Sequence, residues 1–147
     1  MKKTIIAAFM LLLGITAAKA DNDRPINLNQ LPKASQEFLA RHFGDLQLAF
    51  AVEDRKYVGS EYEVTYTDRT EVEFNTNGEW TSVERRYEAV PDAIIPEEIR
   101  KYVSTMDFAG GQQIRKISRD RFEWEIELSN GIEMEFDLNF NIVGIDD

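Results

Sequence analysis

Two segments near the end of the chain alternate between apolar and acidic residues. Residues 122–129 read F-E-W-E-I-E-L-S, residues 132–138 read I-E-M-E-F-D-L, and Asn130-Gly131, which favours a tight turn, stands between them. Alternation with a period of two on both sides of a turn predicts a β-hairpin with one buried face. We expect the inward side chains to be Trp124, Ile126, Leu128, Met134, Phe136 and Leu138. The outward side chains are then Glu123, Glu125, Glu127, Glu133, Glu135 and Asp137.

The same pattern occurs 62 positions earlier in the chain. The apolar residues Tyr62, Val64, Val72 and Phe74 correspond to Trp124, Ile126, Met134 and Phe136. The acidic residues Glu63, Glu71 and Glu73 correspond to Glu125, Glu133 and Glu135. Because acidic as well as apolar positions coincide, we interpret the two segments as copies of one unit.

A helix is expected before each hairpin. Leu31-Pro32 and Ile95-Pro96 each open a segment with helical periodicity, and proline is favoured in the first helical turn. One helical stripe is formed by Ser35, Phe38, Leu39 and His42 in the first segment, and by Ile99, Tyr102, Val103 and Met106 in the second. Further strands are expected at residues 46–53, 79–86, 112–118 and 140–145.

These elements predict the fold class α+β. Two tandem units, at about residues 28–88 and 91–147, would each pack one helix on a four-stranded antiparallel meander sheet, with Pro91 at the joint.

The first 20 residues have the features of a signal peptide. Lys2 and Lys3 precede an apolar run at residues 5–15, and Ala18-Lys19-Ala20 follows with small residues at the cleavage positions. The apolar run is shorter than the roughly 20 residues that a membrane-spanning helix needs. We expect cleavage near Ala20, a periplasmic or secreted domain of residues 21–147, and no stable membrane insertion afterwards.

Removal of the signal peptide makes the chain more acidic. Lys2, Lys3 and Lys19 account for three of the 17 Lys and Arg residues, so 14 basic and 27 acidic side chains remain, a net charge of −13. Such a surface repels nucleic-acid phosphates and anionic lipids, so we expect no nucleic-acid partner. The chain has no cysteine, which excludes disulfides, thiol catalysis and thiolate metal sites.

The sequence offers no catalytic set. His42 is the only histidine, so a serine nucleophile has one possible imidazole base, and no G-x-S-x-G elbow or glycine-rich phosphate loop is present. Paired carboxylates can catalyse glycoside hydrolysis, but a solvent-facing ladder gives them similar environments rather than the contrasting ones that acid and base need. We therefore expect a protein that is not an enzyme, with no cofactor and no dedicated metal site.

The acidic strand faces form the candidate partner-binding surface: Glu63, Glu71, Glu73, Glu123, Glu125, Glu127, Glu133 and Glu135. Like charges opposed on a sheet cost roughly 0.2–1 kcal/mol per pair, so their repetition favours a role such as a platform for a basic partner or weak divalent-cation binding. A solvated face that keeps the protein soluble is the alternative. Basic residues also cluster, and they either neutralise the glutamates or form a contact patch: Arg85, Arg86, Arg115, Lys116, Arg119 and Arg121.

A proline-led helix followed by W-E-I-E-L-S-N-G-I-E-M-E-F-D-L-N, in tandem behind a signal peptide, resembles the PepSY-like family of exported bacterial proteins. That family is related in fold to the β-lactamase inhibitor protein, and the resemblance covers about residues 28–147. It implies two units whose sheets form a shared outer surface, the surface with which the inhibitor grips its partner. PepSY-type domains are suspected of modulating peptidases. We therefore expect an exported binding protein that inhibits or modulates an envelope peptidase or other enzyme, or alternatively a cation- or small-ligand-responsive periplasmic module.

Overall fold

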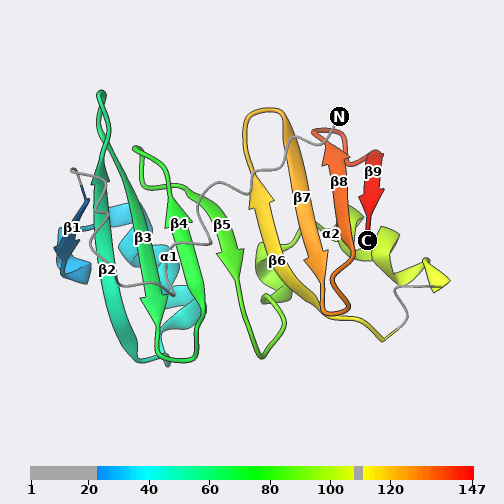
Figure 1. The fold of residues 1–147 in the computed structure, drawn as a ribbon, viewed down its shortest axis with the longest axis horizontal. Helices are drawn as coiled ribbons and strands as arrows, with labels where there is room; N and C mark the ends of the chain where they lie inside the picture. Colours follow the sequence, from blue (N-terminus) through cyan, green and yellow to red (C-terminus); the bar gives the residue numbers. More distant parts are fainter. Residues whose placement is uncertain (1–22, 108–110) are drawn as a thin grey trace.

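A computed structural model describes residues 23–107 and 111–147 of the chain. Within these residues, nine strands form one antiparallel sheet whose spatial order follows the chain, from β1 to β9 (Figure 1). The strands are β1 (Asp23–Ile26), β2 (Leu48–Arg55), β3 (Ser60–Tyr66), β4 (Glu71–Phe74), β5 (Trp80–Glu84), β6 (Ile114–Arg119), β7 (Glu123–Leu128), β8 (Glu133–Asp137) and β9 (Ile142–Asp146). The helices are α1 (Lys33–Phe43) and α2 (Glu97–Ser104), each preceded by a short 3₁₀ turn, Leu28–Gln30 and Asp92–Ile94.

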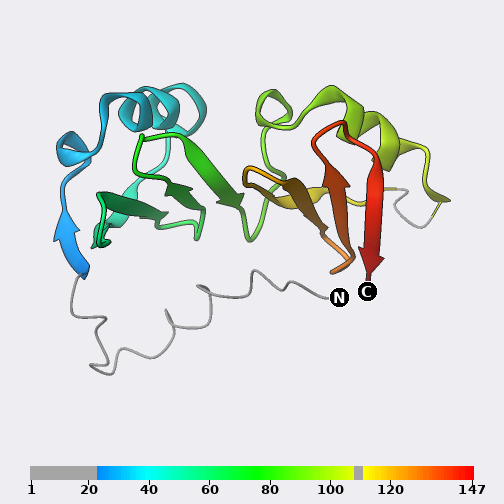
Figure 2. The ribbon, with the colours of Figure 1, turned by 90° about the horizontal axis from the view of Figure 1, so that it is seen from above.

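Both α-helices lie on the same side of the sheet, and among the described residues no helix lies on the other side (Figure 2). Pro32 and Pro96 stand immediately before α1 and α2, as the proline signals predicted. The helices bury Leu39, Phe43, Ile99 and Val103 against apolar strand residues such as Val64, Phe74, Ile126 and Phe136. The core therefore lies between the helices and one face of the sheet. Burial of each such side chain contributes about 1.5–3 kcal/mol to the stability of the fold.

The prediction of two units, each with a four-stranded sheet, is not confirmed, because the described strands form one nine-stranded sheet. Each half has the expected order of one helix and four strands, but β5 and β6 pair with each other through Ser82 with Ser118, Val83 with Ile117 and Glu84 with Lys116. This pairing satisfies backbone groups that two open sheet edges would otherwise expose. The result is one continuous sheet, and the duplication of the halves stays a prediction.

Strand β1 was not predicted, because its four residues show no alternation. It pairs with β2 at the edge of the sheet, where Pro25 is tolerated because an edge strand need not donate every backbone N–H. The Arg24 Nη2 atom lies 3.1 Å from the Glu53 Oε2 atom, and Glu53 is buried. This ion pair fastens the edge strand to the sheet.

The turn at Asn130-Gly131 is longer than the predicted two-residue turn. The Leu128 N–H donates to the Ile132 carbonyl at 2.8 Å, which closes a three-residue loop, and Gly131 has a φ of 89°. Leu138 was predicted to point inward, but it is 51% exposed because β8 ends at Asp137 and Leu138 begins the next loop. The predicted signal peptide at residues 1–20 lies outside the described residues. Among the helices of the described residues, none is long and apolar enough to cross a membrane.

Candidate binding surface

The uncovered side of the sheet carries the predicted glutamates. Alternate residues of the same strands, such as Val64, Val72, Ile126 and Met134, are buried against the helices, so the intervening side chains point to the open side. We call this surface the carboxylate face and define it by nine residues. They are the eight predicted ones, Glu63, Glu71, Glu73, Glu123, Glu125, Glu127, Glu133 and Glu135, together with Glu84, which sequence reasoning missed.

The strand register arranges the face in two long rows that cross six strands, β3 to β8. One row is Glu63, Glu73, Ser82, Ser118, Glu125 and Glu135. The next row is Thr65, Glu71, Glu84, Lys116, Glu127 and Glu133. Glu123 pairs with Asp137 in a shorter row beyond them. The structure thus brings all eight predicted residues to one face, with carboxylates directly opposite each other on neighbouring strands.

The basic cluster predicted as a possible contact patch is divided by the fold. Lys116 lies in the second row of the carboxylate face, whereas Arg119 lies on the helix side over the Trp80 ring. Arg85 contacts Asp68 and Thr70 at the end of β5. These residues therefore form no single patch, because a strand directs them to opposite faces.

The glutamates are half-buried rather than fully solvated. Burial, and then the negative charge of Glu73, raises the pKa of Glu63 to about 7. Burial together with neighbouring carboxylates likewise raises the pKa of Glu71 and of Glu125 to about 7. Burial also raises the pKa of Glu127, while Lys116 opposes the increase. The prediction of a uniformly solvent-facing ladder was wrong, since neighbouring strands cover part of each side chain.

Several buried oxygens on this face have no hydrogen-bond partner within the part of the chain that the structure describes. They are Glu63 Oε1, Glu73 Oε1, Glu84 Oε2 and Thr65 Oγ1. Thr65 is only 8% exposed and stands beside Glu71 in its row. A buried polar group without a partner costs roughly 1–3 kcal/mol. All of these oxygens belong to the first half of the face.

Neither of two cavities on the helix side has the two buried carboxylates of a catalytic pocket. The first, of about 220 Å³, includes Glu37 and Glu79, but both are exposed. The second, of about 310 Å³, lies between α1 and β2, and Tyr66 is its ionisable residue. His42 packs against Phe38 and Phe43, and burial lowers its pKa. Across residues 23–107 and 111–147, no three His, Asp or Glu side chains gather closely enough to hold a metal ion.

In the described residues, the fold is one antiparallel sheet with both α-helices on one face and a row of glutamates on the other. Residues 60–144 match the family model for PepSY-like proteins, which is described as β-lactamase-inhibitor-like. The chain therefore belongs to the PepSY-like family.

Solved structures of Bacteroides proteins share this fold. A candidate periplasmic protein of the DUF2874 family from Bacteroides vulgatus and a candidate calcium-regulated periplasmic protein from Bacteroides thetaiotaomicron are each 40% identical to this chain. Each aligns with a TM-score of 0.82 over 88% of this chain and 100% of its own. A further candidate periplasmic protein of unknown function from Bacteroides vulgatus is 31% identical, with a TM-score of 0.78 over 85% of this chain and 99% of its own. No curated protein matches the chain. Its structural relatives are thus periplasmic proteins, and cleavage near Ala20 stays a prediction.

Proposed function

We propose that the protein is a non-enzymatic binding protein of the bacterial periplasm whose carboxylate face holds a basic segment of a protein partner. By occupying that segment it modulates the partner, an envelope peptidase or another enzyme. The two halves, which we propose to be copies of one unit, supply the two ends of the face.

The arrangement of glutamates opposite one another carries this proposal. Glu63 pairs with Glu73, and Glu125 pairs with Glu135, although opposed like charges cost roughly 0.2–1 kcal/mol per pair. Lysine and arginine side chains remove this repulsion and supply charge-assisted hydrogen bonds. Alternate residues of an extended segment lie about 7 Å apart, the same spacing as alternate glutamates along one strand. A segment with basic residues at alternate positions therefore fits the face.

A peptide with lysine at alternate positions provides a defined probe. We expect calorimetry to detect binding to the purified protein that weakens as salt rises from about 0.05 M to about 0.2 M, because exposed charges are screened. The triple variant Glu125→Gln, Glu133→Gln, Glu135→Gln should bind the peptide about tenfold more weakly or worse. Capture from envelope extract with the same proteins would then identify the natural partner.

The matched control is Glu37→Gln, Glu97→Gln, Glu98→Gln. These exposed glutamates lie on α1 and α2, on the opposite side of the sheet, and their removal changes the net charge by the same amount. We expect the control to bind the peptide as the wild type does. Equal weakening by both triple variants would show that overall charge alone attracts the peptide, and the proposed face would be wrong.

A divalent cation is the second candidate ligand of the same face. Glu63 and Glu73 face each other on β3 and β4, and each has a partnerless oxygen, so they offer a pair of the hard oxygen ligands that Ca²⁺ prefers rather than a closed metal cluster; one structural relative carries a calcium-regulated description. Because the pKa of Glu63 and of Glu71 is raised to about 7, a bound cation would displace protons.

Calcium titration separates this candidate from peptide binding. A calcium-responsive protein should show a rise in Tm with millimolar Ca²⁺ and a binding enthalpy that depends on the ionisation enthalpy of the buffer, because protons are released. The variant Glu63→Gln, Glu73→Gln should lose both effects, whereas Glu125→Gln, Glu135→Gln should keep them. Absence of heat and of any Tm change in the wild type would exclude the cation role and leave the peptide proposal intact.

A further inference from the structure

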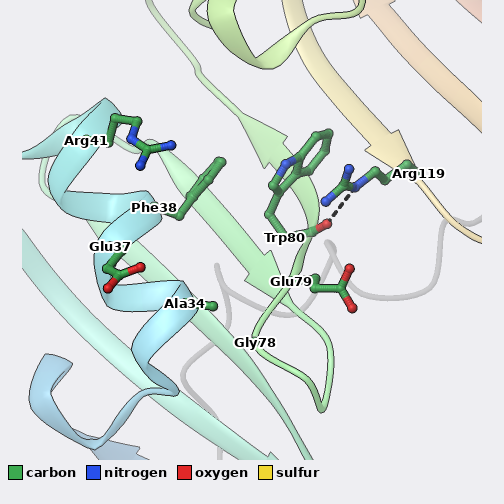
Figure 3. Close-up of a pocket in the computed structure, with 8 residues that line it drawn as sticks. All are labelled: Ala34, Glu37, Phe38, Arg41, Gly78, Glu79, Trp80 and Arg119. Atoms are coloured by element: carbon green, nitrogen blue, oxygen red, sulfur yellow. Dashed lines mark hydrogen bonds between the residues drawn. The ribbon is translucent and has the colours of Figure 1, made fainter.

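A groove on the helix side of the sheet lies between α1 and the junction of β5 with β6 (Figure 3). Its volume is about 220 Å³, below the roughly 300–1,000 Å³ of sites for drug-sized ligands, so it suits a group the size of one ring. The lining residues are Ala34, Glu37, Phe38, Arg41, Gly78, Glu79, Trp80 and Arg119. This groove is on the opposite side of the sheet from the carboxylate face.

Aromatic rings form the apolar part of the groove. The ring centroids of Phe38 and Trp80 are 6.1 Å apart, with planes inclined by 26°. The Trp80 ring also packs against the Trp124 ring across the junction of the two halves, with their centroids 6.0 Å apart. The short side chain of Ala34, which is exposed on α1, leaves the space beside these rings open. The rings therefore offer a surface for a small apolar or aromatic group.

Arg119 supplies a charged group at the edge of these rings. Its Cζ atom lies 3.9 Å from the Trp80 ring centroid, and its Nε–H donates to the Trp80 carbonyl at 2.9 Å. These contacts fix the plane of the guanidinium. Among the described residues, no hydrogen bond reaches its Nη1 or Nη2 atom and no carboxylate lies within 4.0 Å, so the negative charge of Glu79 acts on the guanidinium from beyond that distance. A fixed guanidinium with two free donors suits a planar carboxylate.

In the described residues, the second half lacks counterparts of several side chains that line this groove. At the positions that correspond to Ala34 and Trp80, 64 and 62 residues later, it has Glu98 and Ile142. No strand pairs with the outer edge of β9 in the part of the chain that the structure describes, so no residue takes the place of Arg119. The groove therefore results from the joining of the two halves rather than from either half alone.

We propose that this groove binds a carboxylate attached to a small apolar or aromatic group, with the carboxylate on the free donors of Arg119 and the apolar group beside Phe38 and Trp80. Glu79 and Glu37 at the rim repel a second negative charge, so monocarboxylates are preferred over dicarboxylates. A free small acid and the C-terminus of a peptide share this chemistry.

Phenylacetate and its neutral counterpart phenylacetamide test the proposal directly. NMR shifts of the Trp80 indole N–H, recorded during titration at about 0.15 M salt, report occupancy of the groove. We expect phenylacetate to bind at least about tenfold more tightly than phenylacetamide, because a charge-assisted hydrogen bond is lost in the amide. The tripeptide Gly-Gly-Phe, with a free or an amidated C-terminus, distinguishes the sources: tighter binding than phenylacetate indicates a peptide C-terminus, and equal or weaker binding indicates a small acid.

Two variants remove the site in different ways. Arg119→Gln removes the donors, and Ala34→Gln fills the groove from an exposed helical position without changing the net charge. We expect either variant to weaken phenylacetate binding about tenfold or more. The control Arg121→Gln, which removes an exposed arginine from the nearby β6–β7 turn, should bind as the wild type does. Equal affinity for acid and amide, no shift with either acid at millimolar concentration, or unchanged binding by both groove variants would overturn the proposal.

Discussion

The two halves of the molecule share an order of elements but bury different kinds of residue. Among the described residues, all buried polar or charged side chains lie in the first half: Ser35, Glu53, Thr65, Thr70 and Ser82. In the second half the buried side chains are apolar, including Ile117, Ile126, Leu128, Met134 and Phe136. Both cavities and all the partnerless carboxylate and hydroxyl oxygens also belong mainly to the first half. The comparison shows that the first half buries polar groups in its interior, whereas the core of the second half is apolar.

One pair of equivalent positions shows how the difference arises. In the first half, the Ser35 hydroxyl donates to the Gly78 carbonyl at 2.8 Å and ties α1 to the β4–β5 turn. The corresponding residues of the second half are Ile99 and Phe140, which pack through apolar contacts. The first half therefore has a polar contact with a glycine at these positions, whereas the second half has two larger apolar side chains.

Truncation of the equivalent core residues Phe74 and Phe136 tests whether the halves unfold together. Both are buried, so Phe74→Ala and Phe136→Ala should each lower the free energy of unfolding by about 3–5 kcal/mol. Because β5 pairs with β6, we expect one cooperative transition in each variant when circular dichroism and tryptophan fluorescence follow denaturation in guanidinium chloride. The exposed Val143→Ala serves as control. Two separate transitions would mean that the halves are independent units despite their shared sheet.

Glycines at two turn positions should differ strongly in their tolerance to alanine. Gly78 has a φ of 80°, and a Cβ atom there would lie 2.6 Å from Pro32 Cβ and 3.1 Å from Ser35 Oγ. Gly131 has a φ of 89°, but no atom lies within 4 Å of its Cβ position. Gly78→Ala should therefore cost about 2–4 kcal/mol, and Gly131→Ala about 1 kcal/mol, as measured by chemical denaturation. Equal costs would show that the contact between α1 and the β4–β5 turn is not tight.

The pH dependence of stability should also differ between the halves. The carboxyls of Glu63, Glu71 and Glu125 have a pKa raised from 4.5 to about 7 in the folded protein. Below pH 4.5 these groups are protonated in both states, and as the pH rises towards 7 they ionise more readily in the unfolded chain. The free energy of unfolding therefore falls as the pH rises from 4.5 to about 7. The fall is roughly 1–2 kcal/mol after allowance for solvent screening.

Matched variants assign the loss to one half or the other. Glu63→Gln should flatten the dependence of Tm on pH between about pH 5 and about pH 8 more than Glu125→Gln does, because Glu63 has a buried oxygen without a partner. The exposed Glu97→Gln on α2 is the control and should leave the slope unchanged. A larger effect of Glu125→Gln would reverse the proposed ranking of the two halves.

Local periodicity explains why much of the fold could be predicted from the sequence. The pleat of a strand enforces a period of two, so the alternation of Glu125, Ile126 and Glu127 fixed which side chains face the helices. Prolines likewise marked the start of both helices. Non-local pairing has no such signature. The register between Ser82 and Ser118 joins residues far apart in sequence, and β1 is recognised only through its pairing with β2.

The site was predicted less completely for a related reason. Ile114 and Ile117 both face the core although they are three positions apart, because a register irregularity lies between Ile114 and Lys116. Lys116 and Arg119 are three positions apart on the regular part of β6, so alternation alone places them on opposite faces of the sheet. The half-burial of Glu63 depends on the neighbouring strand, which alternation within one strand does not report. Glu84 could have been found from its alternation with Ser82.

The smallest expected effect concerns Arg69, which occupies in the first half the turn position of Gly131 in the second. Arg69 has a φ of 65°, a conformation that costs a non-glycine residue about 1 kcal/mol. Arg69→Gly should therefore raise the free energy of unfolding by about 0.5–1 kcal/mol, whereas Arg69→Ala removes the same side chain but keeps the strain and should give no increase. Phe140 also has a positive φ, of 64°, but Phe140→Gly should lower the free energy of unfolding. This variant loses the contact between the Phe140 and Trp124 rings, whose centroids are 5.8 Å apart. Stabilisation by Arg69→Ala as large as that by Arg69→Gly would place the cost in the side chain rather than in the backbone.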